Sequence, residues 1–294
     1  MRRIYKIALR TIAGFILLYI MLAIMGAVLV MHIPRLPVTG SPTSVGLTYS
    51  DVSFPSRDNH ITLKGWYLPG QGEKTILVVH GGFQNRVDEL VDTLGLAHDL
   101  VIKGYNVLLF DLRGRGESTG KGLSMMTNEQ DIGGAINYLK SKGYSTADID
   151  VIGFCSGAAS SAIFISGENV GAAVLDGCFA TVRNMVTSQA IAKGVPKPLL
   201  DFFYPGLSAA VKIFYGYTPI NPIDTISNAA CPILFIHEEN DNLVSLQEVD
   251  QLFKASTNPS NILWEVNGAL HSEGYKSNPA SYIDEVDKFI QSVK

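Results

Sequence analysis

Cysteine, histidine and tryptophan are scarce in this chain of 294 residues, which contains three, six and two of them. The cysteines, at positions 155, 178 and 231, are too few and too odd in number for a disulfide framework. Histidine, cysteine and acidic residues nowhere show the spacing of metal ligands. A phosphate loop and a dinucleotide fingerprint are also missing, since the Gly114 and Gly116 pair lacks the helix that should follow. The sequence therefore predicts a protein that uses no metal and no other cofactor.

Positive charge is also low, and it is unevenly distributed. The net charge is −4, yet Arg2, Arg3, Lys6 and Arg10 all precede the first apolar segment. Without these four, 19 basic side chains remain against 27 acidic ones, so the rest of the chain carries about −8. A negative body argues against a nucleic-acid partner and against docking on anionic lipid headgroups.

An uncharged apolar run from Thr11 to Met31 follows the basic segment. As a helix it is about 31 Å long, which is enough to cross the hydrocarbon core of a bilayer. It is longer than the apolar core of a signal peptide, and no clear A-x-A cleavage site follows it. We therefore predict an uncleaved signal anchor rather than a cleaved signal peptide, with the membrane as one partner of the protein.

The basic residues also orient this anchor. Residues 1–10 are predicted to be cytoplasmic, because basic side chains flank the cytoplasmic end of a membrane helix. The protein is then expected to be a single-pass protein of the cell membrane, with its main domain on the extracytoplasmic side. Residues 32–48 are predicted to be a linker, in which three prolines between Pro34 and Ser44 lift that domain off the membrane.

From Tyr49 onward, short apolar runs alternate with segments of helical spacing. The predicted strands are 51–54, 61–67, 75–80, 105–110, 150–154, 170–175, 233–236 and 262–266. The predicted helices are 87–103, 128–141, 156–166, 246–255 and 279–293. The first two strands are expected to pair antiparallel at a sheet edge. Strict alternation of the rest predicts one α/β domain, residues 49–294, with a mainly parallel central sheet and helices on both faces.

One stretch, residues 180–226, interrupts this alternation. It is rich in aromatic residues and holds five prolines, at positions 196, 198, 205, 219 and 222. An insertion of this kind in an α/β domain is interpreted as a small lid over the site. The alternative is a helical excursion that only packs on the sheet edge.

The most informative motif is Gly153-Phe154-Cys155-Ser156-Gly157, at the end of an apolar run. Small residues two before and two after a central residue are typical of a nucleophile elbow, a sharp turn from a strand into a helix. The spacing makes Cys155 the nucleophile, because Ser156 has Phe154 where a small residue is needed. A buried cysteine before a tight glycine turn is the alternative reading of the motif alone.

A nucleophile needs a base and an orienting acid. His271 lies in the loop after the last predicted strand, where parallel sheets place their sites. Asp241 lies in the loop after the preceding strand and is the predicted acid, with Asp176 as the runner-up. Glu238 and Glu239, next to that loop, are interpreted as solvated charges. His80 and His237 end strands and are interpreted as structural.

Two backbone amides are needed for the oxyanion of an acyl-transfer reaction. One is that of Ser156, directly after the nucleophile. The other is expected in the His80-Gly81-Gly82 turn after the third strand, with Gly82 as the best donor and Phe83 next.

Taken together, these motifs resemble the α/β-hydrolase superfamily, in particular the serine-aminopeptidase-like and acyl-esterase-like bacterial hydrolases. The matching stretches are HGGFQNR (80–86), DLRGRGES (111–118), VIGFCSG (151–157), CPILFIHEENDNLV (231–244) and GALHSEGY (268–275). The resemblance implies the α/β-hydrolase fold for the body, which follows the N-terminal transmembrane helix predicted above. It also implies catalytic roles for Cys155, Asp241 and His271, with oxyanion amides from Gly82 and Ser156.

The chain departs from this pattern at two positions. The superfamily usually has serine at the place of Cys155, although dienelactone hydrolases resemble this chain in having cysteine there. Glycine is usual at the place of Glu238. The function expected from these residues is hydrolysis of a small acyl substrate, such as an ester or thioester, through a Cys-His-Asp triad. A catalytically weak binding or assembly module and an acyltransferase are the alternatives.

Overall fold

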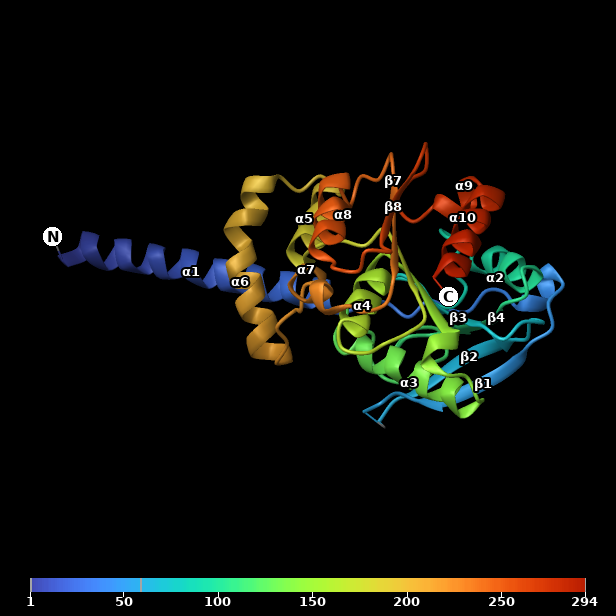
Figure 1. Cartoon of the computed structure of the whole chain (residues 1–294). Coiled ribbons are helices and arrows are strands. Elements are labelled where there is room, and N and C mark those ends of the chain that lie inside the picture. The colour runs from blue at the N-terminus through green and yellow to red at the C-terminus, as the bar shows by residue number, and fades with distance from the viewer. Residues whose placement is uncertain (1, 59, 294) are drawn as a thin grey trace.

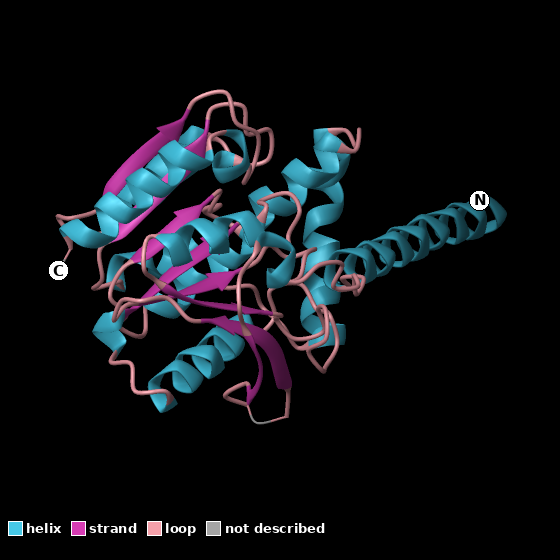
Figure 2. Ribbon diagram, turned by 90° about the vertical axis from the view of Figure 1, so that its right-hand side faces the viewer, coloured by secondary structure: helices cyan, strands magenta, loops and turns pink. Residues whose placement is uncertain are grey.

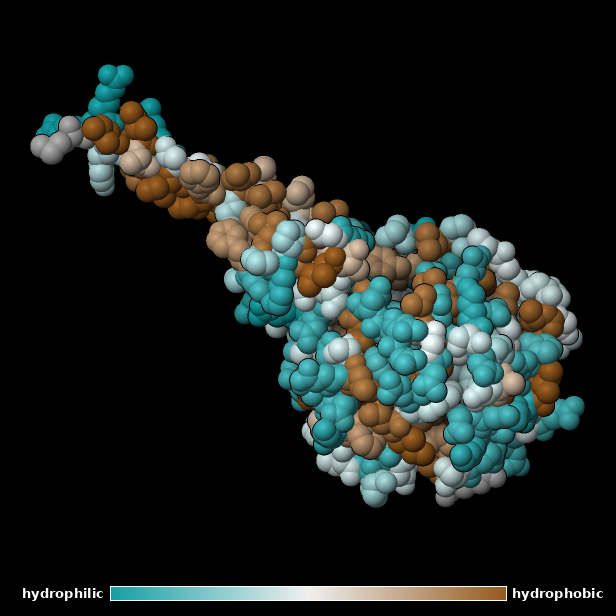
Figure 3. All heavy atoms as spheres, turned by 90° about the horizontal axis from the view of Figure 1, so that it is seen from above, coloured by the Kyte–Doolittle hydropathy of each residue, from teal (hydrophilic) through white to brown (hydrophobic). Residues whose placement is uncertain are grey.

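The computed structural model describes residues 2–58 and 60–293. Met1, where the predicted cytoplasmic segment begins, and Lys294, where the predicted α/β domain ends, lie outside the described residues. A long helix, α1 (Arg2–Met31), projects from a compact α/β body (Figure 1). By length and composition α1 is apolar enough to cross a membrane. Apolar side chains cover most of its shaft, and polar side chains gather at its tip (Figure 3).

The body is built on one sheet of eight strands in the order β1-β2-β4-β3-β5-β6-β7-β8. The first two strands pair antiparallel, β2 pairs antiparallel with β4, and all later pairs are parallel. The strands are β1 (Ser50–Pro55), β2 (Thr62–Leu68), β3 (Thr75–Val79), β4 (Asn106–Phe110), β5 (Ile149–Phe154), β6 (Ala173–Asp176), β7 (Ile233–Glu238) and β8 (Ile262–Val266). The predicted α/β class and mainly parallel sheet are confirmed.

Helices cover both faces of the sheet, as predicted (Figures 1 and 2). One face carries α3 (Asn128–Ser141), α4 (Ser156–Ile165) and α8 (Leu246–Ala255), and the other carries α2 (Thr93–Ile102) and α10 (Pro279–Ser292). Short helices are η1 (Pro42–Val45), η2 (Thr146–Asp148), η3 (Ile226–Asn228) and α9 (Gly274–Ser277). Every residue of β3 and β5 is buried, because apolar side chains from both layers of helices pack on these strands.

Helix α2 begins later than the apolar spacing of residues 87–103 predicts. Asp92, in a left-handed conformation, caps it through the amide of Gly95 at 3.2 Å, so the helix starts at Thr93. Upstream, Asp88 accepts from the Leu90 amide at 3.0 Å and holds a loop instead of a helical turn. Local hydrogen bonds from aspartates therefore outweigh the helical periodicity at this point.

The segment predicted as a linker, residues 32–48, is hydrogen-bonded to the body near its start. Arg35 donates to the carbonyls of Gly116, Ser118 and Gly120 at 3.0, 2.6 and 3.1 Å. The end of α1 is also tied to the body, since the Ser124 amide donates to the Met31 carbonyl at 2.9 Å. The start of this segment therefore lies against the loops at residues 116–124.

The insertion at residues 180–226 is helical. It consists of α5 (Val182–Ala192), α6 (Lys197–Tyr215) and α7 (Pro222–Thr225), followed by η3. In Figures 1 and 2, α6 stands upright and lies across α1. The aromatic residues that mark this stretch in the sequence serve that contact, as Tyr19 of α1 stacks on Phe203 with ring centroids 5.1 Å apart.

Candidate active site

Cys155 lies at the turn between β5 and α4 in a strained backbone conformation, with φ 51° and ψ −118°. The turn is tight because a Cβ on Gly153 would lie 2.7 Å from the Ala158 Cα. A Cβ on Gly157 would lie 2.4 Å from the carbonyl oxygens of Val79 and His80. Strain of this kind at a half-buried side chain is the geometry of a nucleophile elbow.

The loops after β7 and β8 bring Asp241 and His271 together. The Nδ1 atom of His271 lies 2.6 Å from Oδ2 of Asp241, whose side chain is fully buried. The other oxygen of Asp241 accepts from the amides of Leu243 and Val244 at 2.7 and 2.9 Å. These amides fix the carboxylate, and the carboxylate in turn fixes the imidazole with its Nδ1 toward the acid.

Cys155 is the second partner of His271. Burial alone would lower the pKa of His271, but the neighbouring Cys155 side chain and the charge and hydrogen bond of Asp241 raise it to about 11. The Nε2 atom of His271 is buried and has no hydrogen-bond partner by strict geometry among the described residues. This atom is therefore available to exchange a proton with the thiol or with a bound substrate.

Gly82 and Ser156 lie against each other beside the thiol. A Cβ on Gly82 would meet the Ser156 Oγ at 2.5 Å, and a Cβ on Gly81 would lie 3.8 Å from the Cβ of Cys155. Ser156 is the first residue of α4, and the first amides of a helix have no partner within it. Its helix dipole also favours negative charge at this end. The structure thus brings the two predicted oxyanion residues to the same side of Cys155.

Glu238 departs from the prediction of a solvated charge: it is fully buried at the end of β7. Asp176, also fully buried, ends the adjacent strand β6 and interacts with Glu238, although its register partner in β7 is Ile236. Burial raises the pKa of Glu238 well above its usual range, and the charge of Asp176 adds to that rise. Tyr282 donates to Asp176 at 2.8 Å. Protonation of Glu238 therefore removes one of the two like charges that the pair would otherwise bury.

Asp176, the runner-up acid, therefore belongs to this buried pair and not to the ring of His271. The pair was missed because an acidic residue after an apolar run looks like the start of a loop. The signal that could have revealed it is the departure at Glu238 itself, where related sequences usually have glycine.

Arg115 is a further residue that the sequence patterns did not single out. Its side chain is buried, and its Nε donates to the Gly82 carbonyl at 2.9 Å. The same guanidinium donates to the carbonyls of Arg113 and Leu123 at 3.1 and 3.4 Å. Burial lowers the pKa of Arg115 to about 10, which leaves it charged at neutral pH. Arg115 therefore stabilises the glycine turn through the Gly82 carbonyl.

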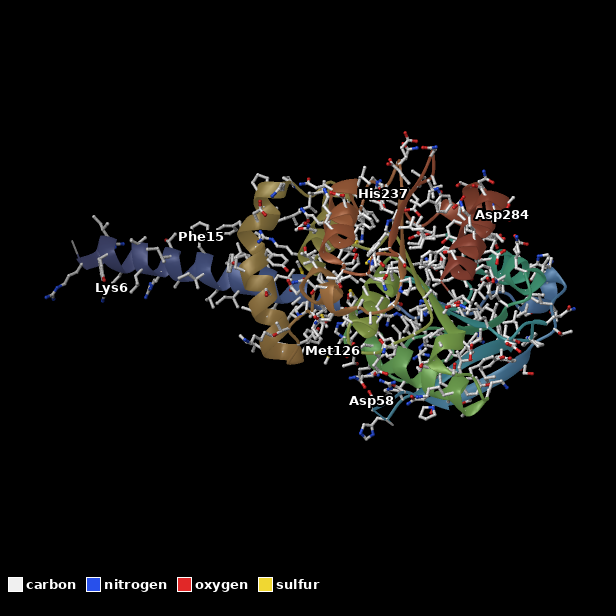
Figure 4. The ribbon with its side chains drawn as sticks, viewed as in Figure 1. Lys6, Phe15, Asp58, Met126, His237 and Asp284 are labelled. Carbon is white, nitrogen blue, oxygen red and sulfur yellow. The ribbon has the colours of Figure 1, made fainter. Side chains whose placement is uncertain are left out.

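The remaining cysteines and histidines have structural surroundings. Cys178 and Cys231 are buried core residues, as predicted, and burial raises the pKa of Cys231 to about 12. His80 is buried, and its Nε2 accepts from the Leu112 amide at 3.1 Å. Burial lowers the pKa of His80 to about 3, so its ring is neutral. His237 ends β7 near the top of the view in Figure 4 and is buried.

A protein-family comparison matches part of the chain. The profile of the dienelactone hydrolase family matches residues 202–286, a stretch that includes β7, β8 and the loops of Asp241 and His271. Among curated proteins, the uncharacterized protein YqkD of Bacillus subtilis (strain 168) is 25% identical over 243 residues. That alignment covers 79% of this chain and 76% of the relative.

Solved structures resemble the whole domain. Esterase Pf2001 of Pyrococcus furiosus is 26% identical with a TM-score of 0.75, over 90% of this chain and 98% of the esterase. Est1E of Butyrivibrio proteoclasticus, solved with ferulic acid, is 16% identical with a TM-score of 0.62, over 82% and 99% of the two chains. Hypothetical protein PA2218 of Pseudomonas aeruginosa is 18% identical with a TM-score of 0.66, over 89% and 100%. The fold predicted from the sequence is confirmed.

Proposed function

We propose that this chain, a hydrolase of the α/β-hydrolase superfamily, cleaves acyl esters or thioesters through Cys155, His271 and Asp241. The observation that carries the proposal is the alignment of the three groups. The thiol stands on a strained turn beside a histidine whose pKa is raised and whose ring Asp241 orients at 2.6 Å. Such an arrangement activates a thiol that is otherwise a weak nucleophile at neutral pH.

The reaction would proceed in two halves. The Cys155 sulfur attacks the acyl carbonyl and forms a C–S bond, while the carbonyl electrons move to oxygen. The amides of Gly82 and Ser156 stabilise this oxyanion. The oxyanion then collapses, the bond to the leaving group breaks, and the His271 imidazolium gives its proton to the departing alcohol or thiol.

The second half releases the acyl group. Neutral His271 takes a proton from water, and the resulting hydroxide attacks the thioester at the same oxyanion position. Collapse of that intermediate frees a carboxylic acid and returns the thiolate, with His271 protonated again. The proton that His271 then holds, taken from water, replaces the one that left the Cys155 thiol before the first attack, so the cycle is closed.

The same proposal includes a membrane anchor. Residues 11–31 would span the membrane, residues 1–10 would face the cytoplasm, and residues 49–294 would form the catalytic domain outside it. The length and apolar surface of α1 and the basic residues before Thr11 support this arrangement. The helical insertion, residues 180–226, would act as the lid, because α5 starts shortly after Gly177, which touches the His271 ring.

Activity and thiol reactivity test the catalytic assignment together. The full chain in detergent should hydrolyse activated short-chain esters, and Cys155→Ala should lower kcat/KM by about 10³-fold or more. Iodoacetamide should label Cys155 rapidly in the full chain and slowly in His271→Ala. Cys231→Ala is the matched control, because that thiol is buried away from the site, and it should retain both activity and labelling.

Two results would contradict the assignment. Unchanged ester turnover in Cys155→Ala would remove the cysteine from the reaction. Slow labelling that does not depend on His271 would favour a binding or assembly module instead. Addition of a competing alcohol or amine and analysis of the products would separate hydrolysis from acyl transfer.

A further inference from the structure

The part of α1 that stands clear of the body is too short to cross a bilayer. Residues from Arg2 to Leu18 are exposed, whereas the body begins to cover α1 at Tyr19. The uncharged part of the free helix, Thr11 to Leu18, is about 12 Å long, against about 30 Å for a hydrocarbon core. Lys6 and Phe15 both lie on this free part (Figure 4). A bilayer that begins after Arg10 must therefore extend well past Tyr19.

Helix α6 is what covers α1 in that region. A Cβ on Gly206 would lie 2.8 Å from the Tyr19 ring and 3.0 Å from the Cβ of Ala23. The Gly206 amide donates to the Tyr19 hydroxyl at 3.1 Å, and that hydroxyl donates to the Phe202 carbonyl at 3.1 Å. Backbones this close form a fixed contact, so α6 sits at a fixed height on α1. Ala23, at the crossing, lies about 12 Å below Met31, the end of the predicted span.

Exposed apolar residues flank the crossing along α6. Leu199, Phe202, Ala209 and Ile213 lie by their spacing on the side of α6 that also holds Gly206, and all four are exposed on either side of the contact with α1. The exposed fraction is 63% for Phe202 and 74% for Ile213. Neighbouring exposed apolar side chains of this kind mark surfaces that meet a partner or a membrane.

The charged residues of α6 lie on a different side. Lys197 and Asp201 form an ion pair at 2.7 Å, and Arg183 of α5 joins it at 3.1 Å. An amphipathic helix that lies across a membrane-spanning helix has the geometry of an interfacial helix in the plane of the bilayer. The apolar face of α6 continues the exposed apolar surface of α1, which is the neighbouring lipid-facing surface under the proposed anchoring.

We propose that α6 is immersed among the acyl chains of the outer leaflet, and that the lid thereby presents the active site to lipid esters carried by that leaflet. This inference rests on the proposed anchoring for the immersion and on the proposed function for the substrates. The occupant of the apolar face is the bilayer and not a second copy of the chain, because α1 cannot span the bilayer without drawing α6 into it.

Lipid contact is tested in the full chain reconstituted into phosphatidylcholine vesicles. Phe202→Cys and Ile213→Cys, each in a Cys155→Ala chain, are labelled with an environment-sensitive fluorophore. Lipids with a quencher on the acyl chain should quench both positions. The same label at Ile102→Cys, a position 68% exposed on α2, should not be quenched. Absence of quenching at Phe202 and Ile213 would overturn the immersion, and cross-linking between copies through these cysteines would assign the face to a dimer.

Substrate access is tested with Cys155 intact. Phe202→Glu/Ile213→Glu should lower turnover of a long-chain ester embedded in the vesicles about tenfold, and it should leave a water-soluble short-chain ester unchanged. Ile102→Glu should affect neither. Equal loss on both substrates would overturn the presentation role. If the unsubstituted chain does not hydrolyse the short-chain ester at all, the proposed function is contradicted instead. Failure of the presentation role and failure of the proposed function are therefore distinguishable.

Discussion

At residue 155 a thiol replaces the more usual hydroxyl while the surrounding geometry is kept. The imidazole of His271 and the carboxylate of Asp241 are placed as they would be for either nucleophile, and the helix N-terminus adds its dipole. A thiol in this setting needs less help to ionise than a hydroxyl does, but its acyl intermediate is a thioester. The residue therefore shifts the demand from forming the intermediate to hydrolysing it.

Replacement of Asp241 tests how far the acid matters. In Asp241→Asn the amide cannot stabilise the imidazolium and favours the wrong tautomer of His271. We expect kcat/KM for an activated ester to fall by about 10²- to 10⁴-fold. The measurement is steady-state turnover, and circular dichroism checks that the fold is intact. Full activity in this variant would assign the orienting role to another group.

Glu238 provides a pH-dependent prediction. Its folded pKa is raised above the ordinary value of 4.5, so the folded chain holds its proton to higher pH than the unfolded chain does. Stability is therefore lost as the pH rises above about 4.5 toward the folded pKa. Glu238→Gln mimics the protonated form. Its Tm should therefore fall less between pH 5 and pH 8 than the Tm of the unsubstituted chain does.

The control for this measurement is Glu239→Gln, the exposed neighbour. The titration of His271 also removes stability as the pH rises, since its pKa is raised too, but it is common to all three chains. A difference between Glu238→Gln and Glu239→Gln therefore reports the buried pair. Parallel curves would mean that Glu238 is ionised in the folded protein.

A residue's place in the candidate site could be predicted only where the sequence around it contained a recognisable motif. Cys155, Asp241 and His271 each follow a strand in a recognisable order, so their proximity could be inferred from the alternation of elements. The burial of Glu238 could not, because it depends on Asp176 in the adjacent strand and on Tyr282 from α10. Such pairings exist only after the sheet has formed.

Among the elements, the turn from β5 to α4 places Cys155, the proposed nucleophile, and has no room for a side chain at Gly153 or Gly157. Gly157→Ala forces a Cβ to 2.4 Å from two carbonyl oxygens of the β3 end. We expect a loss of about 1–3 kcal/mol in unfolding free energy, together with lower activity, because the strand and helix must separate. Chemical denaturation measures the first effect and ester turnover the second.

Gly167→Ala serves as the comparison for that variant. Its added Cβ would lie 3.8 Å from the nearest atom, the Phe164 carbonyl oxygen, which is an ordinary contact. Its stability and turnover should therefore match those of the unsubstituted chain. Equal losses in the two variants would show that the turn is no more sensitive than the surface.

The bounds of the elements were predictable where periodicity acted alone. The ranges expected for α3 and α8, 128–141 and 246–255, are those found. Helix α2 was not predictable in its first turns, because Asp88 and Asp92 set its start through side-chain hydrogen bonds. The contact of α6 with α1 was also not predictable. Small residues such as Gly206 and Ala23 indicate close packing, but they do not indicate which helix packs there.

In the whole molecule, α1 and the domain form one packed unit. Arg35→Ala should loosen this unit, because it removes hydrogen bonds from a charged donor to three carbonyls. We expect faster cleavage by thermolysin within residues 32–48 and a loss of about 1–2 kcal/mol in unfolding free energy. Lys288→Ala, which removes a surface ion pair on α10, should change neither. Unchanged proteolysis in Arg35→Ala would show that other contacts hold the segment.

The way in which the end of α1 is joined to the body decides what a protease can release. The Ile33 amide donates to the Gly122 carbonyl at 2.8 Å, and His32 forms an isolated β-bridge with Leu123. Since α1 also packs against α6, a nick in residues 32–48 would leave two fragments that remain associated. Under the proposed anchoring, the domain would then stay attached to the membrane after such a cut, and its release would require the α1–α6 contact to open as well.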